Sequence, residues 1–269
     1  MTGAVVVTVS ALPTVYNVGG GGNYCSGGTG LQITLDNSNT GINYQVYNGG
    51  SPVGGFVAGT GSAMNLGLQT LAGTYTVVAV NSATGCTSNM SGSTMITIDP
   101  LPTVYNVLGG GNYCAGGAGL NVTLSSSDIN FEYQLYRNGV LTGAPMNGTG
   151  LALDFGAQTL AGTYTIIATN AVTATHCTSN MSGSAAISAN PVPAIFVVTG
   201  GGSYCAGGAG THVGLSFSAT SINYQIVLNG TPTGMPVSGT GTVLDLGLFS
   251  APGTYTVVAA NALTGCSSN

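Results

Sequence analysis

Residues 162–170 read Gly-Thr-Tyr-Thr-Ile-Ile-Ala-Thr-Asn, and this stretch decides the fold because it recurs twice. The two other copies share its Gly-Thr-Tyr-Thr start and its final Asn, and they lie at 73–81 and 253–261. Read with a period of two, Tyr164, Ile166 and Ala168 fall on one face and mostly threonines on the other, as in a strand packed on a sheet. The sequence therefore predicts a central strand in each of three repeated β domains.

A Tyr-Cys pair sets the period of the repeat. The pairs lie at 24–25, 113–114 and 204–205, so successive copies are 89 and 91 residues apart, the size of one small β-sandwich. We expect an orphan last strand of a preceding repeat followed by three units, the third without its own last strand; these segments are 1–11, 12–100, 101–191 and 192–269. Proline-containing linkers restrict the backbone between units and predict a semi-rigid rod.

Each unit carries about seven short strands with turn signals between them. An Asn-Gly pair after the Tyr-Gln strand predicts a type I′ hairpin, because both central residues of that turn need a positive φ. These pairs are Asn48-Gly49, Asn138-Gly139 and Asn229-Gly230. Shorter strands are expected at 103–107, 151–155 and 94–98. No segment has helical periodicity, so we predict an all-β chain of three tandem immunoglobulin-like β-sandwich domains.

Two sets of tyrosines recur in the three units. The tyrosine of the Gly-Thr-Tyr motif resembles a tyrosine corner, in which the hydroxyl bonds to nearby backbone, although these side chains could instead simply fill the core. The members of this set are Tyr75, Tyr164 and Tyr255. Because the chain has no tryptophan, the tyrosines of the Tyr-Gln strand are expected at the core position that Trp occupies in antibody domains; they are Tyr44, Tyr133 and Tyr224.

The composition excludes several classes of partner. Only 3% of the residues are charged, there is no lysine, and Arg137 is the single basic side chain apart from histidine. Binding to nucleic acid or to an anionic membrane surface requires clustered Lys and Arg, so neither partner is expected. No apolar run reaches the ~18 residues of a membrane span, so membrane insertion is not expected either.

The two ends of the chain match internal positions. Residues 1–3 align with 90–92 and 181–183, whereas the final Ser-Asn aligns with 88–89 and 179–180. The segment after residue 3 is therefore expected to be the orphan last strand, made of Ala4, Val5, Val6, Val7, Thr8 and Val9. We expect it to complete the third domain of the copy before it, either because the chain is an excerpt of a longer repeat protein, which we favour, or because subunits polymerise by β-strand donation. A frayed tail is the remaining alternative.

Six cysteines in three equivalent pairs predict disulfides in an oxidising compartment. Pairing within units would join Cys25–Cys86, Cys114–Cys177 and Cys205–Cys266. Pairing across the linkers would join Cys86–Cys114 and Cys177–Cys205. We favour the first, because a bridge between an early segment and the end of the central strand would close a sandwich.

The combined motifs resemble the tandem immunoglobulin-like repeats of very long cell-surface proteins of the Bacteroidota, among them gliding-motility adhesins and other cargo of the type IX secretion system. The motifs are Tyr-Cys-Ala-Gly-Gly-x-Gly, Tyr-Gln-aliphatic, Gly-Thr-Tyr-Thr-Val-Val-Ala, Thr-Gly-Cys and Asn-Pro-x-Pro, and together they cover essentially the whole chain. The resemblance implies export to the cell surface, a stalk or filament role, and a bridge within each domain. The middle unit departs from the pattern, since 174–177 read Ala-Thr-His-Cys in place of Thr-Gly-Cys.

Candidate chemical sites are few. His176 and His212 occupy non-equivalent positions without a repeated acidic or serine partner, and the acids are scattered at Asp36, Asp99, Asp128, Glu132, Asp154 and Asp245. We therefore predict no catalytic residues, no metal and no cofactor. Exposed aromatic residues could bind surface glycans, but packing at the domain junction explains them better; the candidates are Tyr16 and Tyr105, with Phe196 at the third position.

The function expected from the sequence is structural. We predict the shaft of an extracellular bacterial surface filament or adhesin, whose partners are neighbouring repeats or further copies of the chain arranged head to tail. The alternatives are an array of glycan- or surface-binding modules and a subunit that polymerises by strand donation.

Overall fold

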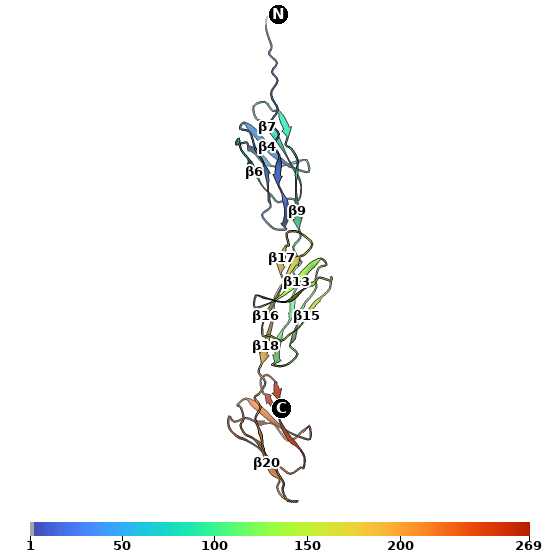
Figure 1. Cartoon of the computed structure of the whole chain (residues 1–269), viewed down its shortest axis with the longest axis vertical. Helices are drawn as coiled ribbons and strands as arrows, with labels where there is room; N and C mark the ends of the chain where they lie inside the picture. The colour runs from blue at the N-terminus through green and yellow to red at the C-terminus, as the bar shows by residue number, and fades with distance from the viewer. Residues whose placement is uncertain (1–2) are drawn as a thin grey trace.

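The chain forms three β-sandwiches placed end to end, as the computed structural model shows for residues 3–269 (Figure 1). Within these residues all regular secondary structure is β-strand. The strands of the three sandwiches span residues 18–99, 107–190 and 198–268. The predicted class, all-β with three tandem immunoglobulin-like sandwiches, is confirmed, while the unit boundaries assigned from the sequence stay a prediction.

The first sandwich packs a three-stranded sheet, in the order β1-β3-β6, against a six-stranded sheet, in the order β2-β9-β7-β4-β5 with β8 beside β7. Its strands are β1 (Val18–Gly20), β2 (Gly22–Cys25), β3 (Leu31–Leu35), β4 (Ile42–Asn48), β5 (Ser51–Ala58), β6 (Met64–Gln69), β7 (Gly73–Asn81), β8 (Thr87–Asn89) and β9 (Thr94–Asp99). The inward face of β7 carries Tyr75, Val77 and Ala79, all 0% exposed. The period-two pattern thus buries one face of the central strand between the sheets.

The second sandwich repeats this topology strand for strand. Its strands are β10 (Val107–Gly109), β11 (Gly111–Cys114), β12 (Leu120–Leu124), β13 (Phe131–Arg137), β14 (Val140–Asn147), β15 (Leu153–Gln158), β16 (Gly162–Asn170), β17 (Thr178–Asn180) and β18 (Ala185–Asn190). Tyr164, Ile166 and Ala168 of β16 are buried, as the alternation predicts.

A closing strand completes each of these two sandwiches. In the first, β9 pairs in parallel with β2 and antiparallel with the start of β7, so Ile96 lies opposite both Gly22 and Gly73. In the second, β18 pairs in the same way with β11 and β16, and Ile187 takes the corresponding position. Ile96 and Ile187 are 1% and 3% exposed, so each closing strand contributes a core side chain.

The third sandwich has no closing strand within the described residues. Its sheets are β19-β20-β24 and β22-β21-β25-β26, with β23 beside β21. The strands are β19 (Val198–Gly200), β20 (Thr211–Leu215), β21 (Ile222–Leu228), β22 (Thr231–Pro232), β23 (Val237–Ser238), β24 (Leu244–Phe249), β25 (Tyr255–Asn261) and β26 (Ser267–Ser268). Residues 202–205, which correspond to β2 and β11, lie outside any strand here. An unpaired backbone edge therefore runs along this repeat.

Two strand boundaries expected from the sequence need correction. The strand expected at 103–107 begins only at Val107, because the backbone N–H groups of Thr103 and Tyr105 bond instead to the side chains of Asp128 and Met181. The strand expected at 151–155 runs from Leu153 to Gln158, since the carbonyl of Leu151 accepts a bond from the Ser127 hydroxyl.

The hairpin turns follow the Asn-Gly prediction in two repeats of three. Asn138-Gly139 and Asn229-Gly230 all have positive φ, and they separate directly paired strand residues. In the first repeat Asn48 pairs with Ser51, so the two central residues are Gly49 and Gly50. The prediction was therefore one residue out of place there, because a second glycine was available to take the left-handed conformation.

Candidate functional site: the junctions between repeats

The disulfides join neighbouring repeats. Cys25 bonds to Cys177 and Cys114 bonds to Cys266; both bridges span 152 residues, with Cα separations of 5.6 and 5.5 Å. The remaining two thiols, Cys86 and Cys205, are free. The predicted pairs within units, Cys25–Cys86, Cys114–Cys177 and Cys205–Cys266, are wrong, and so are the alternative pairs across the linkers, Cys86–Cys114 and Cys177–Cys205.

Strand direction explains why a bridge within one repeat cannot form. Gly22 of β2 and Gly73 of β7 lie level with each other opposite Ile96, but from there the two strands run in opposite directions. Cys25 therefore lies at the end of the sandwich that faces the second repeat, and Cys86 lies beyond the other end. The length of β7 separates these ends by roughly 25 Å at about 3.3 Å per residue. A disulfide requires Cα atoms within about 7 Å.

The same directions explain the bridges that do form. The Tyr-Cys pair of one repeat ends beside the following repeat, and the cysteine before β17 or β26 lies at the near end of that following repeat. Pairing across a linker fails because Cys86 lies at the end of the first repeat that faces away from the second. Cys114 lies at the end of the second repeat that faces away from the first. Each bridge thus joins the end of one sandwich that faces the following repeat to the adjoining end of that following repeat.

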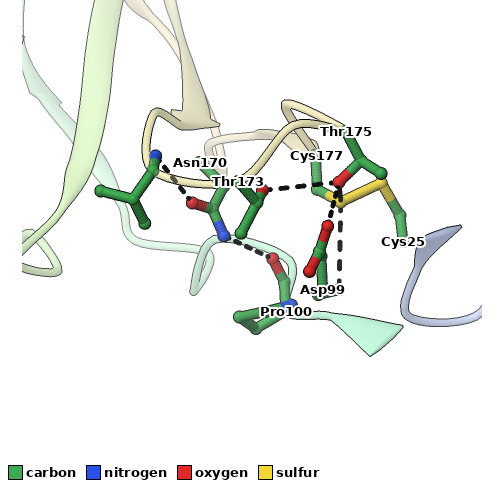
Figure 2. The surroundings of a disulfide bond; sticks show 8 residues. Cys25, Asp99, Pro100, Asn170, Thr173, Thr175 and Cys177 are labelled. Carbon is green, nitrogen blue, oxygen red and sulfur yellow. Dashed lines mark hydrogen bonds between the residues drawn. A yellow bond between two sulfur atoms is a disulfide. The ribbon is translucent and has the colours of Figure 1, made fainter. Parts of the chain in front are cut away.

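Asp99, the last residue of β9, anchors the first junction (Figure 2). Its carboxylate accepts a hydrogen bond of 2.5 Å from the Thr175 hydroxyl, and the residue is 4% exposed. Asn170 donates from its amide nitrogen to the carbonyl oxygen of Pro100 at 3.3 Å. The bonded Cys177 is 2% exposed beside these contacts. The junction is therefore a buried polar contact around a disulfide, and such contacts fix geometry because an unpaired buried group is costly.

The second junction uses corresponding segments with fewer polar contacts. Cys266 is 0% exposed, and the Ser268 hydroxyl donates to the carbonyl oxygen of Pro193 at 2.9 Å. Asn190 ends β18 where Asp99 ends β9. Asn170 ends β16 and contacts Pro100, whereas Ser268 belongs to β26 and contacts Pro193, so each repeat contacts the proline linker that precedes it. These contacts were not predicted from the sequence.

The tyrosine predictions are confirmed. Tyr75, Tyr164 and Tyr255 donate their hydroxyl hydrogens to the carbonyl oxygens of residues four positions earlier, at 2.7, 2.7 and 2.8 Å. The core set is buried, with Tyr44, Tyr133 and Tyr224 at 0%, 0% and 2% exposure. Each of these three hydroxyls also accepts a backbone N–H from the residue five positions earlier. Both sets therefore satisfy a polar tip while the ring fills the core.

The N-terminal segment expected to act as a closing strand lies apart from the sandwiches. Residues 4–9 form no strand, and Val5, Val6, Val7 and Val9 are between 81% and 97% exposed. In Figure 1 this segment extends beyond the first sandwich, at the opposite end of the molecule from the third. Donation of this strand to another copy stays a prediction.

The aromatic residues considered for glycan binding have internal partners. The Tyr105 hydroxyl donates to the carboxylate of Asp128 at 2.6 Å, and the Tyr16 hydroxyl bonds to the side chain of Asn39. In the third repeat both partners change together, to Phe196 and Ala219, and Phe196 contacts Phe217 with the rings tilted and their centroids 5.3 Å apart. Each ring packs against the core of its own repeat, so packing within the repeat explains these residues and the expected packing at the domain junction is wrong.

One histidine has an acidic partner that the sequence did not reveal. His212 Nδ1 lies 2.8 Å from a carboxylate oxygen of Asp245, on the exposed face of the three-stranded sheet. In the second repeat Asn121 donates to Asp154 at the same place, so the pair repeats with a change of donor. A backbone hydrogen bond from Gly247, and then the His212 contact, lower the pKa of Asp245. His176 lies exposed in the loop before Cys177.

Among residues 3–269, no three His, Cys, Asp or Glu side chains are grouped so as to hold a metal ion. No helix in the same part of the chain has the length and apolar character to cross a membrane.

Comparison with known proteins adds a family match for the first repeat. Residues 11–100 match the family described as Ig-like domain CHU_C associated. No curated protein matches the chain.

Solved structures that resemble the chain include the FN1–FN3 domains of chicken CNTN1, with 14% identity, 97% of each chain covered and a TM-score of 0.31. The fibronectin(III)-like modules of Clostridium thermocellum CbhA show 16% identity over 64% of this chain and 90% of theirs, with a TM-score of 0.34. The human OSCAR ligand-binding domain shows 14% identity over 66% of this chain and all of its own, with a TM-score of 0.28. The protein is a tandem of three immunoglobulin-like β-sandwich domains, the first of which matches the CHU_C-associated Ig-like family.

Proposed function

We propose that the chain is part of the shaft of an extracellular bacterial surface filament or adhesin. Tandem immunoglobulin-like domains with disulfides fit a structural extracellular module. The observation that carries the proposal is the pair of bridges between repeats, Cys25–Cys177 and Cys114–Cys266. An array of binding modules needs only flexibly linked domains. Disulfides between successive domains, each beside a buried junction, are instead suited to transmitting tension along a rod.

The surface chemistry supports the same role. A chain with no lysine and a single arginine offers almost no sites to proteases that cleave after those residues. Its low charge also makes contacts along the rod nearly insensitive to salt. The sequence resemblance to Bacteroidota surface repeats suggests gliding adhesins or other type IX secretion cargo as the class of parent protein.

The proposal is tested by immunogold electron microscopy of intact cells that produce the protein, using an antibody raised against residues 3–269. We expect label along the length of a surface appendage. Label confined to appendage tips would instead favour a glycan- or surface-binding module, and label confined to the cell interior would overturn an extracellular role. Cells from which the gene is deleted provide the control.

A further inference from the structure

The open edge of the third repeat carries two hollows, one where the first two repeats hold a closing strand and one where they hold the methionine that precedes it. One, of about 370 Å³, is lined by residues that include Gly202, Tyr204, Gly253 and Tyr255. The corresponding residues of the first repeat, Gly22, Tyr24, Gly73 and Tyr75, are the ones that pair with β9. The hollow thus has the backbone partners of a closing strand on both sides.

The second hollow has the lining of a methionine site. It measures about 310 Å³ and is lined by residues that include Phe196 and Val257. In the second repeat the corresponding residues, Tyr105 and Ile166, hold Met181: the Tyr105 N–H lies 3.4 Å from its sulfur, and its own N–H donates to the Ile166 carbonyl at 2.9 Å. Met181 is 5% exposed. A segment that fills both hollows therefore needs a methionine followed closely by a strand.

The N-terminal segment of the chain has this sequence. Met1 aligns with Met90 and Val7 aligns with Ile96 of β9, both at an offset of 89 residues, and Met1 also aligns with Met181 of the second repeat. Val7 is 88% exposed in its own molecule, whereas Ile96 is 1% exposed. By the register of β9, Val7 of the donated strand would lie opposite Gly202 and Gly253, and Val9 opposite Tyr204.

The free thiols lie at the positions that such a contact would join. Cys205 follows the same tyrosine position as Cys25 and Cys114, and it is exposed. Cys86 occupies the same position in the repeat as Cys177 and Cys266. Both observed bridges join the first type of cysteine to the second type in the next repeat. Continuing this pattern past the third repeat pairs Cys205 with Cys86 of another copy.

We propose that the third repeat is an acceptor site for a second copy of this chain, which inserts residues 4–9 as the closing strand and forms a Cys205–Cys86 disulfide. The interface is head to tail, so both partners keep a free donor or acceptor end and assembly continues. Apolar burial of Val7 and the β-ladder hold the strand, and the disulfide makes the junction covalent. The inference does not depend on the shaft function.

The covalent step needs an oxidant, for which a low-molecular-weight disulfide suffices. One thiolate attacks the oxidant to give a mixed disulfide and one released thiol, and the second thiolate then displaces the other half. The Sγ–Sγ bond between Cys205 and Cys86 forms, two protons and two electrons leave the protein thiols, and the oxidant is reduced to two thiols.

The test uses the full chain with oxidised glutathione and non-reducing gels. Wild-type protein is expected to give a ladder in multiples of 26.3 kDa that reductant collapses. Cys86→Ser alone and Cys205→Ser alone should stay monomeric, whereas their equimolar mixture should give a dimer and nothing larger. Mass spectrometry of the dimer should find the Cys86–Cys205 peptide pair. Monomer only, or dimers of either single variant, would overturn the proposal.

A matched pair of variants tests the strand. Val7→Asp places a charge at the position whose counterpart Ile96 is 1% exposed, and it should slow dimer formation in that mixture at least tenfold. Val6→Asp is the control, because its counterpart Met95 is 61% exposed on β9; it should leave the rate within about twofold. Equal rates for Val7→Asp, Val6→Asp and the parent would show that the thiols join without the strand, which would overturn the acceptor site. Circular dichroism checks that each variant is folded.

Discussion

The second and third repeats share their core strands but differ along one edge. In the second, β18 lies between β11 and β16, and Tyr164 at the tyrosine corner is 1% exposed. In the third, the matching Tyr255 is partly exposed, Tyr204 is 41% exposed and the segment before Cys205 forms no strand. The tyrosine corner and the core tyrosine persist without the closing strand. The central strands therefore organise the sandwich, whereas the closing strand orders the edge and positions its cysteine.

The largest expected effect comes from weakening a closing strand that is present. Ile96→Ala removes a fully buried side chain from β9 and should lower the free energy of unfolding of the first repeat by about 2–5 kcal/mol. Amide hydrogen exchange at Gly22–Cys25 should accelerate, since these amides depend on the ladder with β9. Met95→Ala, on the exposed face of the same strand, is the control and should change stability by less than about 0.5 kcal/mol. Equal effects of both variants would refute a role for burial.

A smaller effect should distinguish the tyrosine corners of the complete and open repeats. Tyr75→Phe removes a partly buried hydrogen bond to the Leu71 carbonyl and should cost about 1 kcal/mol. Tyr255→Phe removes an exposed bond to the Ala251 carbonyl, which water can replace, so its cost should be lower. Chemical denaturation monitored by hydrogen exchange in each repeat measures both. A cost for Tyr255→Phe as large as that for Tyr75→Phe would show that the closing strand does not shield the corner.

The smallest effect concerns pH and the Tyr105–Asp128 pair, which the third repeat replaces with Phe196 and Ala219. Burial alone would raise the pKa of Asp128, but hydrogen bonds from Tyr105 and Thr103 outweigh it and the pKa lies below its usual value. A carboxyl with a depressed folded-state pKa stabilises the fold above its unfolded pKa of about 3.9, and this contribution is lost as pH falls through the folded pKa.

In thermal melts at pH 6 and in steps below pH 4, the melting temperature of the wild type should therefore fall as the pH is lowered. The part of this fall that is due to Asp128 should be absent from the double variant Tyr105→Phe, Asp128→Ala. We expect a difference of a few degrees or less, since Asp128 is only half-buried and solvent weakens the contribution of its hydrogen bonds. A wild-type acid response identical to that of the double variant would contradict the assigned pKa direction. Tyr16→Phe, in the first repeat, controls for loss of a tyrosine hydroxyl beside a neutral amide.

Sequence periodicity was sufficient for the fold but not for the junctions. The alternation of Tyr164, Ile166 and Ala168 and the Gly-Thr-Tyr motif predicted buried faces and tyrosine corners that the structure confirms. The disulfide pairing failed because Gly22–Cys25 is short and comes at the end of a glycine run, so it does not read as a strand, and its parallel pairing with β9 decides where Cys25 lies. Equal spacing could not have decided the pairing: the observed bridges both span 152 residues, but the rejected pairs Cys86–Cys114 and Cys177–Cys205 also have equal spans. The Asp99–Thr175 contact depends on docking across the junction, which local patterns do not encode.

The stagger of the two bridges has a consequence for damage. Cys25–Cys177 closes one long covalent ring and Cys114–Cys266 closes another, and the two rings overlap through most of the second repeat. Any single peptide bond between Cys25 and Cys266 therefore lies inside at least one ring. A protease that cuts once anywhere in this span, including at either linker, leaves one covalently continuous molecule. After such a cut, separating the rod into two pieces there requires at least a second cut or the reduction of a disulfide, because the overlapping rings still connect both sides.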